Sequence, residues 1–409
     1  MALGNVMIGQ SGGPTAVINA SLVGVFKTAK DEGCKTVYGM RNGIEGLLEE
    51  RYVDVSDYVK NDLDIELLKR TPSSFLGTCR YKLPGAEQAP ELYEKIFEIL
   101  KRLGVKYFFY IGGNDSMDTV MQLSAYALKI GSDVRFMGIP KTIDNDLFCT
   151  DHTPGFGSAA KYIAGTMKEI IRDATSYSSD SVTVVEIMGR NAGWLTAASS
   201  LARTEDCDGP DLIYLPEVVF DRNRFLEKIK KLKEKKKTVV VAISEGIKTA
   251  DGKYVCEANK NTTVVDAFGH KLLGGTALYL SDFLTDELGI KCRGIVLSSL
   301  QRCASHLVSR RDITEAFMAG ADAVLAALKG ETGKMIIFKR ISNTPYSIVT
   351  ESVDIREIAN KEKRVPLEWI TEDGTYVTAE FDAYARPLII GELSPFMVAG
   401  LPRHLFIDK

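Results

Sequence analysis

The chain has 409 residues, with 51 Lys and Arg against 54 Asp and Glu, which gives a formal net charge of −3. This balance excludes a general attraction to nucleic acid or to an anionic membrane surface. The hydrophobic fraction of 45% is enough to offset the entropy of ordering, which excludes a mainly disordered chain. The length predicts two or three domains.

The first residues and the cysteines predict a cytoplasmic protein. Residues 1–13 lack the basic stretch of a signal peptide and lead directly into a strand-like run. No apolar run approaches the roughly 18 residues that cross a bilayer, so we expect no membrane partner. The seven cysteines include no CxxC pair, which favours reduced thiols over disulfides or a zinc site.

In chain order, strand-like runs alternate with helical patterns over the first 250 residues. Residues 5–9 predict a strand, and a helical pattern follows that ends near Gly33. Residues 105–111 predict a second strand, followed by a helix through about residue 128. Further strands are predicted at 134–139, 182–188, 212–215, 238–243 and 294–297, and a helix at 225–237. Such alternation is typical of parallel sheets covered by helices on both faces.

These strands are too many for one sheet, so we predict an α/β fold with two αβα lobes of Rossmann type. The first lobe is expected at 1–155 with part of 303–330, and the second at 156–302. From residue 331 the pattern changes to strand-like runs with fewer helices. We interpret 331–409 as a C-terminal extension with strands near 334–338, 346–352 and 376–379.

The first unusual residues follow the first predicted strand, where open parallel sheets bind ligands. Ser11-Gly12-Gly13-Pro14-Thr15 joins this strand to a helix. Its glycines let backbone N–H groups approach an anion, which the helix N-terminus also attracts. A plain tight turn explains this loop equally well.

A second Gly-rich strand end carries Asn114, Asp115 and Ser116. Asn and Asp commonly cap a helix at such a position. Oxygen ligands beside a Gly-rich loop also suit Mg²⁺, which shares its coordination with phosphate and water.

The third strand end, residues 140–146, combines Lys141, Thr142, Asp144 and Asp146. Asp and Asn are frequent in solvated turns, so that interpretation stays open. The functional interpretation divides proton abstraction and the positioning of metal or water between the two carboxylates. Lys141 would neutralise charge on a transferring phosphoryl group. Two Gly-rich loops, a lysine and several carboxylates together favour phosphoryl transfer.

Six strings of the sequence, in this order and spacing, resemble the phosphofructokinase family, and within it the pyrophosphate-dependent branch. They are residues 12–19, 112–116, 140–146, 188–190, 242–246 and 299–302. The resemblance covers about residues 1–330. It implies transfer of phosphate from pyrophosphate to the 1-hydroxyl of fructose 6-phosphate, a glycolytic step, with Mg²⁺ as cofactor.

The resemblance also implies the roles of single residues. Asp144 matches the catalytic base, with Thr142 and Asp146 beside it, and Arg190 matches the residue that stabilises the transferring phosphate. The donor phosphate is assigned to Gly12, Gly13, Arg80 and Ser116. The sugar phosphate is assigned to Thr142, Ile143, Asp144, Met188, Gly189, Arg190, Glu245, Arg293, Ser299, Leu300, Gln301 and Arg302.

Within that set, Glu245 matches a carboxylate that bonds sugar hydroxyls, and Arg293 and Arg302 match arginines that hold the 6-phosphate. Asp115 and Lys141 complete the catalytic set, because ATP-using members usually carry glycine at these positions. A carboxylate at 115 would repel the α-phosphate of ATP, and Lys141 adds positive charge near the leaving phosphate. The pair therefore implies pyrophosphate as the donor.

The sequence departs from the family pattern at three sites. Asn114, which we assign to the metal, stands where many members have an aspartate that helps hold Mg²⁺. Ser299 replaces a His or Tyr of the 6-phosphate site, and Ser181 replaces an arginine that bacterial ATP enzymes supply across a subunit interface. We expect other groups, including some from the extension, to complete the site.

Three alternatives stay open: an ATP-dependent phosphofructokinase, a pyrophosphate-dependent kinase that also accepts sedoheptulose 7-phosphate, and a catalytically silent regulatory subunit. Asp115 and Lys141 argue against the first, and retention of Asp144, Asp146 and Arg190 argues against the last. We expect a homo-oligomer, dimeric or tetrameric.

Overall fold

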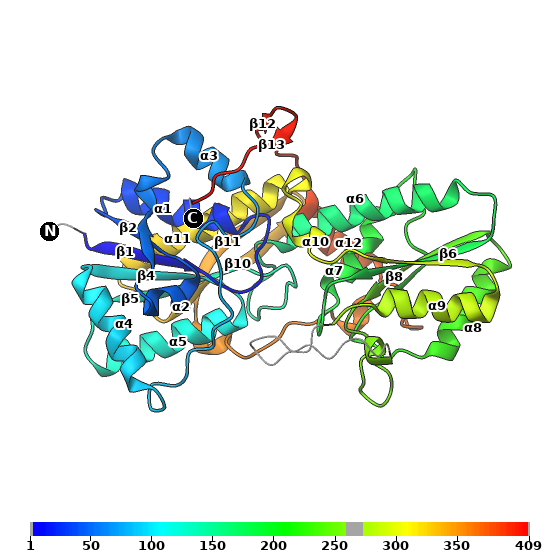
Figure 1. Ribbon diagram of the computed structural model, residues 1–409, viewed down its shortest axis with the longest axis horizontal. Coiled ribbons are helices and arrows are strands. Elements are labelled where there is room, and N and C mark those ends of the chain that lie inside the picture. The colour runs from blue at the N-terminus through cyan, green and yellow to red at the C-terminus, as the bar shows by residue number, and fades with distance from the viewer. Residues whose placement is uncertain (1–2, 259–272, 408–409) are drawn as a thin grey trace.

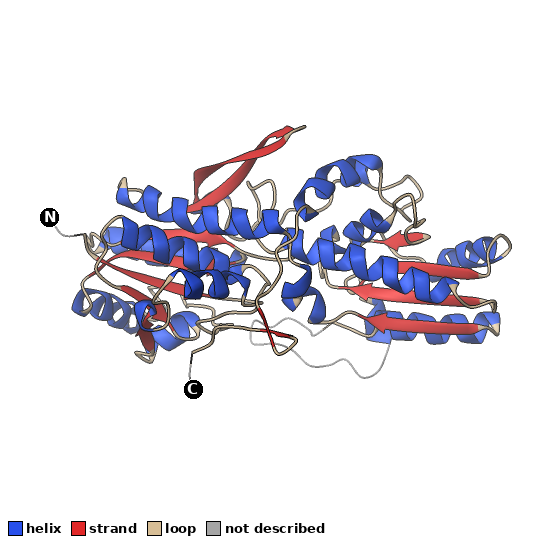
Figure 2. Ribbon diagram, turned by 90° about the horizontal axis from the view of Figure 1, so that it is seen from above, coloured by secondary structure: helices blue, strands red, loops and turns tan. Residues whose placement is uncertain are grey.

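The computed structural model describes residues 3–258 and 273–407 and places them in two lobes that lie side by side (Figure 1). In each lobe a sheet lies between helices, as the view from above in Figure 2 shows. The predicted α/β fold with two lobes of mainly parallel sheet is thereby confirmed. No helix within the described ranges is long and apolar enough to cross a membrane.

The larger sheet belongs to the first lobe and has the strand order β11-β10-β5-β4-β1-β2-β3. Its strands are β1 (Asn5–Gln10), β2 (Val37–Met40), β3 (Tyr52–Asp54), β4 (Val105–Gly112), β5 (Arg135–Pro140), β10 (Lys334–Asn343) and β11 (Tyr346–Asp354). The five inner strands are parallel, and β3 and β11 are antiparallel at the two edges. The central strands carry buried apolar side chains on both faces, as a covered parallel sheet requires.

Helices cover both faces of this sheet. One face packs against α1 (Ile18–Asp31), α3 (Asp62–Arg70) and α11 (Arg310–Leu328). The other packs against α2 (Gly43–Leu48), α4 (Pro90–Arg102) and α5 (Asn114–Lys129). Helix α11 lies far along the chain but returns to the first lobe, where it packs against α1 and β5.

The second lobe has a smaller parallel sheet with the strand order β7-β8-β6-β9. Its strands are β6 (Ser181–Ile187), β7 (Leu212–Tyr214), β8 (Thr238–Ser244) and β9 (Lys291–Val296). Helices α6 (Phe156–Thr175), α7 (Trp194–Ala197) and α12 (Ala379–Ala385) pack on one face. Helices α8 (Arg222–Lys233) and α9 (Thr276–Leu288) pack on the other, and α10 (Leu300–Cys303) follows β9.

The strand register brings the carboxyl ends of several strands together. In the first lobe Gln10 pairs with Ile111, and Gly112 pairs with Pro140. In the second lobe Ile187 pairs with Ser244. The loops that follow β1, β4 and β5 therefore begin at one edge of the first sheet, and those after β6 and β8 begin at one edge of the second.

The C-terminal segment, of which the structure describes 331–407, takes part in both lobes. Strands β10 and β11 extend the larger sheet beyond β5. Helix α12 and the 3-10 helix η7 (Arg386–Ile389) pack against α6 and η2 (Ala198–Ala202) of the second lobe. The segment 334–354 therefore completes a sheet, and 379–389 completes a helical layer.

The strand expected at 376–379 is replaced by a single bridge between Ile370 and Val377 and by the start of α12. The β-branched residues of this stretch favour extended backbone, which Thr378 adopts just before the helix. Glu380 and Asp382 then lie in the first helical turn, where negative charge is favourable. The short strands β2 and β3 were not predicted.

Candidate active site

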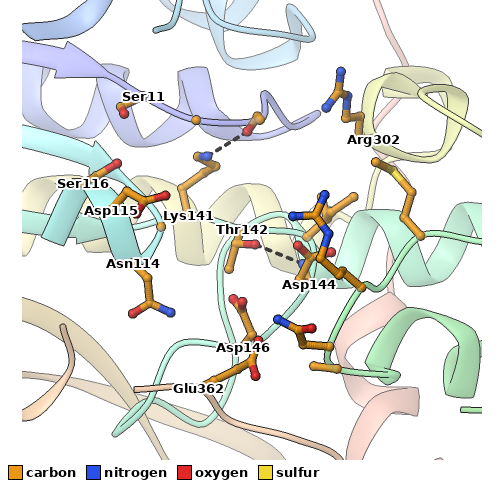
Figure 3. Close-up of a pocket in the computed structure, with 18 of the residues that line it drawn as sticks. Ser11, Asn114, Asp115, Ser116, Lys141, Thr142, Asp144, Asp146, Arg302 and Glu362 are labelled. Carbon is orange, nitrogen blue, oxygen red and sulfur yellow. Dashed lines mark hydrogen bonds between the residues drawn. The ribbon is translucent and has the colours of Figure 1, made fainter. Parts of the chain in front are cut away.

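A cavity of about 370 Å³ lies between the lobes at the carboxyl ends of β1, β4 and β5 (Figure 3). It is lined by Ser11, Gly12, Gly13, Pro14, Arg80, Gly113, Asn114, Asp115, Ser116, Lys141, Thr142, Ile143, Asp144, Asp146, Met188, Arg190, Asn191, Ala192, Glu245, Arg302 and Glu362. All three Gly-rich or charged strand ends of the first lobe meet here. Residues after β6 and β8 close the cavity from the second lobe.

The loop after β1 brings backbone close to two cations. Gly12 has a φ of 76°, in the left-handed region that glycine adopts without strain. A Cβ added there would lie 3.3 Å from Lys141 Nζ, and one added at Gly13 would lie 3.3 Å from Arg302 Nη1. The absence of side chains thus leaves an uncovered backbone facing two positive charges, which suits a phosphate group.

Lys141 is buried beneath this loop, and its Nζ donates to the carbonyl oxygen of Gly13 at 2.7 Å. Burial lowers the pKa of Lys141 to about 8, although Asp144 and Asp146 oppose that shift. The amine is therefore mostly protonated at neutral pH. It supplies a positive charge at the loop where the sequence predicts the donor phosphate.

Helix α5 begins at the same place and carries three predicted residues. Asp115 is exposed in its first turn and lines the cavity, whereas Ser116 is buried with its Oγ beside Gly112. The Asn114 Oδ1 atom is buried and makes no hydrogen bond within the described part of the chain. Asp115 suits a helix N-terminus, and in this position it also presents a carboxylate to the cavity.

The loop after β5, residues 141–153, is held in an irregular conformation. Thr142 Oγ1 accepts from the backbone N–H of Asp144 at 3.1 Å. Asn145 has a left-handed φ of 55°, and its side chain accepts from Thr153 N at 3.0 Å. Because Asn145 is buried while its two neighbours face the cavity, both carboxylates project from one short stretch of backbone. We call residues 141–153 the catalytic loop.

Burial raises the pKa of both carboxyl groups. For Asp144, the charges of Lys141 and Arg190 oppose this shift. For Asp146 the pKa rises to about 7, through burial first and then through the charges of Asp144 and Glu362. A carboxylate with a raised pKa near two cations is well suited to accept a proton at neutral pH.

The second lobe contributes Met188, Arg190 and Glu245. The N–H of Met188 donates to Gln301 Oε1 at 3.2 Å, and the N–H of Gly189 donates to Glu245 Oε1 at 3.4 Å. Burial, and then the charge of Asp144, raises the pKa of Glu245 to about 7. Met188, Arg190 and Glu245 thus form part of the cavity wall on the side of the second lobe.

Five of the predicted sugar-phosphate residues lie outside the cavity lining: Gly189, Arg293, Ser299, Leu300 and Gln301. Gly189 and Gln301 are hydrogen-bonded to two residues that do line the cavity, Glu245 and Met188. Arg293 lies on β9, 3.5 Å from Asp173, and lines a separate small cavity with Ser181. Ser299 and Leu300 are exposed. The roles assigned to these residues stay predictions.

Glu362 is a cavity residue that sequence reasoning did not find. It belongs to the C-terminal segment and follows no strand or Gly-rich turn that would draw attention to it. Its neighbours Lys361, Lys363 and Arg364 make it look like part of a solvated charged loop.

The side chains of the cavity include several possible ligands for a hard cation. Oxygen atoms are offered by Asn114, Asp115, Asp144, Asp146 and Glu362. No three His, Cys, Asp or Glu side chains come together as a metal cage in residues 3–258 and 273–407. The oxygen ligands fit a cation that shares its coordination with a bound phosphate.

Comparisons with known proteins show which family the chain is related to. A family model described as phosphofructokinase matches residues 5–326. The chain is 42% identical, over 99% of its length and 96% of the relative, to a pyrophosphate–fructose 6-phosphate 1-phosphotransferase of Methylococcus capsulatus. It is 41% identical to the protein of that name from Halomonas elongata, with 98% and 96% covered.

Among solved structures, a pyrophosphate-dependent phosphofructokinase from Marinobacter aquaeolei is similar with a TM-score of 0.87 and 36% identity. The match covers 100% of this chain and 98% of that one. A family model spans most of the chain, relatives are similar to it over nearly its whole length, and the solved structure shares its overall fold. The chain belongs to the phosphofructokinase family.

Proposed function

We propose that this protein transfers a phosphate from pyrophosphate to the 1-hydroxyl of fructose 6-phosphate, giving fructose 1,6-bisphosphate and phosphate. The observation that carries the proposal is the pair Asp115 and Lys141 at the donor end of the cavity (Figure 3). Relatives that are 41% and 42% identical carry the name of this activity, which supports it.

The chemistry follows from the catalytic loop. The sugar 1-oxygen attacks the terminal phosphorus of pyrophosphate, its proton passes to the Asp144 carboxylate, and the bond from phosphorus to the bridging oxygen breaks. Phosphate leaves with the electron pair of that bond. Lys141 and Arg190, whose charges act on Asp144, also stabilise the negative charge that spreads over the transferring group.

Mg²⁺ is the cofactor that we propose, and Asn114 and Asp146 would take part in holding it. When bound, it would neutralise charge on the diphosphate and so make the leaving group easier to expel. The uncommitted Asn114 Oδ1 and the oxygen-rich lining support this assignment.

The choice of donor follows from charge. Pyrophosphate ends where the α-phosphate of ATP would begin, so a carboxylate at 115 repels only the longer donor. Lys141 lies against the loop that would hold the donor, at 2.7 Å from Gly13 O, and compensates part of the charge of the leaving phosphate.

The acceptor end is formed by Arg190, Glu245 and Arg302, of which the arginines suit a phosphate and the carboxylate suits sugar hydroxyls. Arg293 lies outside the cavity of its own chain. We therefore propose that it acts from a neighbouring subunit of a homo-oligomer. A cytoplasmic location is proposed with the same activity.

Initial rates with fructose 6-phosphate, Mg²⁺ and either pyrophosphate or ATP test the proposal. We expect a much higher kcat/KM with pyrophosphate. A preference for ATP would keep the Asp144 mechanism and refute the donor argument. Turnover of sedoheptulose 7-phosphate at a comparable rate would widen the acceptor range, and no turnover with any pair would identify a silent subunit.

A further inference from the structure

Residues 362–365, which we call the interlobe strap, connect the two loops that carry the catalytic groups. The N–H of Lys363 donates to Asp146 O at 2.7 Å, and Glu362 pairs with Leu147 in an antiparallel bridge. On the side of the second lobe, Trp194 Nε1 donates to Lys363 O at 3.0 Å. The strap is thus bonded to both lobes.

The side chain of Lys363 fixes the strap on the catalytic loop. Its Nζ donates to Asp151 O at 2.7 Å and to Thr150 O at 3.1 Å, and lies 5.0 Å from the centre of the Trp194 ring. At the far end, the Val365 N–H donates to Glu217 Oε1 at 3.0 Å, which also accepts from Gly193 N at 2.8 Å. The backbone that follows Glu362 is therefore anchored at Lys363 and at Val365.

This anchoring directs the Glu362 side chain into the cavity. Its side chain is 28% exposed, and Figure 3 shows its carboxylate beside that of Asp146 and away from Lys141 and Arg302. Within the described ranges its one ion pair is with Arg364 at 3.4 Å, and the Arg364 side chain is 60% exposed. Such an exposed pair contributes little, so it does not explain why Glu362 faces the cavity.

Two adjacent carboxylates oppose the binding of a strongly anionic diphosphate unless a cation lies between them. Mg²⁺ is commonly bound through one or two protein carboxylates together with phosphate oxygens and water. The chain offers no third carboxylate at residue 114, where the family resemblance places one, and no three-residue cage within its described part.

We propose that Glu362, together with Asp146, holds the divalent cation that accompanies pyrophosphate, an inference that rests on the proposed function. Glu362 supplies the carboxylate that Asn114 does not. Because the protein contributes too few ligands alone, the cation binds with the diphosphate rather than before it. The site is completed by a residue beyond the 5–326 span of the family model.

Binding of Mn²⁺ in the presence of inorganic pyrophosphate, without a sugar acceptor, tests this directly. Equilibrium dialysis against a protein-free compartment with the same pyrophosphate concentration reports the dissociation constant of protein-bound Mn²⁺ without turnover, because chelation by free pyrophosphate is equal on both sides. We expect Glu362→Gln to raise the dissociation constant for Mn²⁺ about 10-fold or more. Even the replacement of a residue that only supports a metal ligand commonly weakens metal binding by about 10- to 100-fold. Glu362→Asp, which keeps the charge, should recover part of the affinity.

Two matched controls separate this role from a structural one. Glu368 lies in the same C-terminal segment, just after the interlobe strap, and its side chain is exposed. Glu368→Gln should therefore bind Mn²⁺ like the parent protein. Arg364→Gln removes the partner of Glu362 and should also leave Mn²⁺ affinity unchanged. Thermal unfolding of each variant shows whether the fold is retained.

Unchanged Mn²⁺ affinity in folded Glu362→Gln overturns the inference and leaves the proposed function intact. An equal loss in Arg364→Gln also overturns it, because the ion pair would then explain the effect. If the parent protein binds no Mn²⁺ with pyrophosphate and has no pyrophosphate-dependent activity, both the proposed function and the inference fail.

Discussion

Replacing Tyr384 with Phe tests whether the C-terminal segment positions the catalytic loop, because it removes a single hydroxyl between them. That hydroxyl accepts from Asn145 Nδ2 at 2.8 Å and donates to Asp151 O at 2.7 Å. Tyr384 and Asn145 are both buried, so bulk water does not replace the lost bonds.

The expected loss of stability follows from the hydrogen-bonding groups that Tyr384→Phe leaves without a partner. The carbonyl of Asp151 keeps a second donor, Lys363 Nζ at 2.7 Å. Asn145 Nδ2 loses its acceptor and becomes a buried, unsatisfied donor. Such a group costs about 1–3 kcal/mol, and we expect the free energy of unfolding of Tyr384→Phe to fall by that amount.

The effect on activity comes from the place of Asn145 between Asp144 and Asp146. Its left-handed φ of 55° is maintained by bonds on both ends of its side chain amide. Loss of one bond lets the backbone shift, and a misplacement of 1 Å can cost about 100-fold in rate. We expect kcat to fall toward that limit, with a smaller change in the KM for fructose 6-phosphate.

Urea unfolding and initial rates measure both effects. Tyr177→Phe is the matched control, because Tyr177 is 54% exposed and the loss of its hydroxyl should change neither quantity. A destabilised Tyr384→Phe variant with an unaltered kcat would refute the positioning argument. Stability equal to that of the control would refute the hydrogen-bond argument as well.

Three further predictions concern the cavity itself. Asp144→Ser should lower kcat by about 100- to 10,000-fold, the usual contribution of a general base, while calorimetry shows fructose 6-phosphate still bound. The double variant Asp115→Gly and Lys141→Gly should raise the ratio of kcat/KM for ATP to that for pyrophosphate about tenfold or more, because a like-charge contact is removed. Since burial raises the pKa of Glu245 from 4.5 to about 7, its folded form binds the proton more tightly than its unfolded form. Stability is then lost as pH rises through that window, and Glu245→Gln should raise the free energy of unfolding at pH 8 by about 1–3 kcal/mol.

A specific result would contradict each of these three predictions. Equal loss of catalysis and sugar binding in Asp144→Ser would assign that carboxylate to substrate capture. A folded double variant that still discriminates against ATP as strongly as the parent would show that residues 115 and 141 do not select the donor. If Glu245→Gln and the parent protein are equally stable between pH 4.5 and 8, burial does not raise the pKa of Glu245.

Local pattern was enough to predict most strands and the strand ends that line the cavity. The runs at 105–111 and 238–243 lie within β4 and β8, because buried parallel strands need continuous apolar residues. Gly12, Lys141 and Asp144 follow such strands, and parallel strands present their carboxyl ends at one edge. By contrast, the four-residue β2 and the three-residue β3 are too short to show a period.

The α/β class, the polar strand ends and the family resemblance could be predicted because each depends on residues close together in the chain. The contacts of Glu362, Lys363 and Tyr384 with the catalytic loop, and the position of Arg293 outside the cavity, become visible only in the folded structure. More than 200 residues separate Asn145 from Lys363 and Tyr384. Their contact comes from the packing of the C-terminal segment onto both lobes, and apolar burial between distant segments leaves no period in the local sequence.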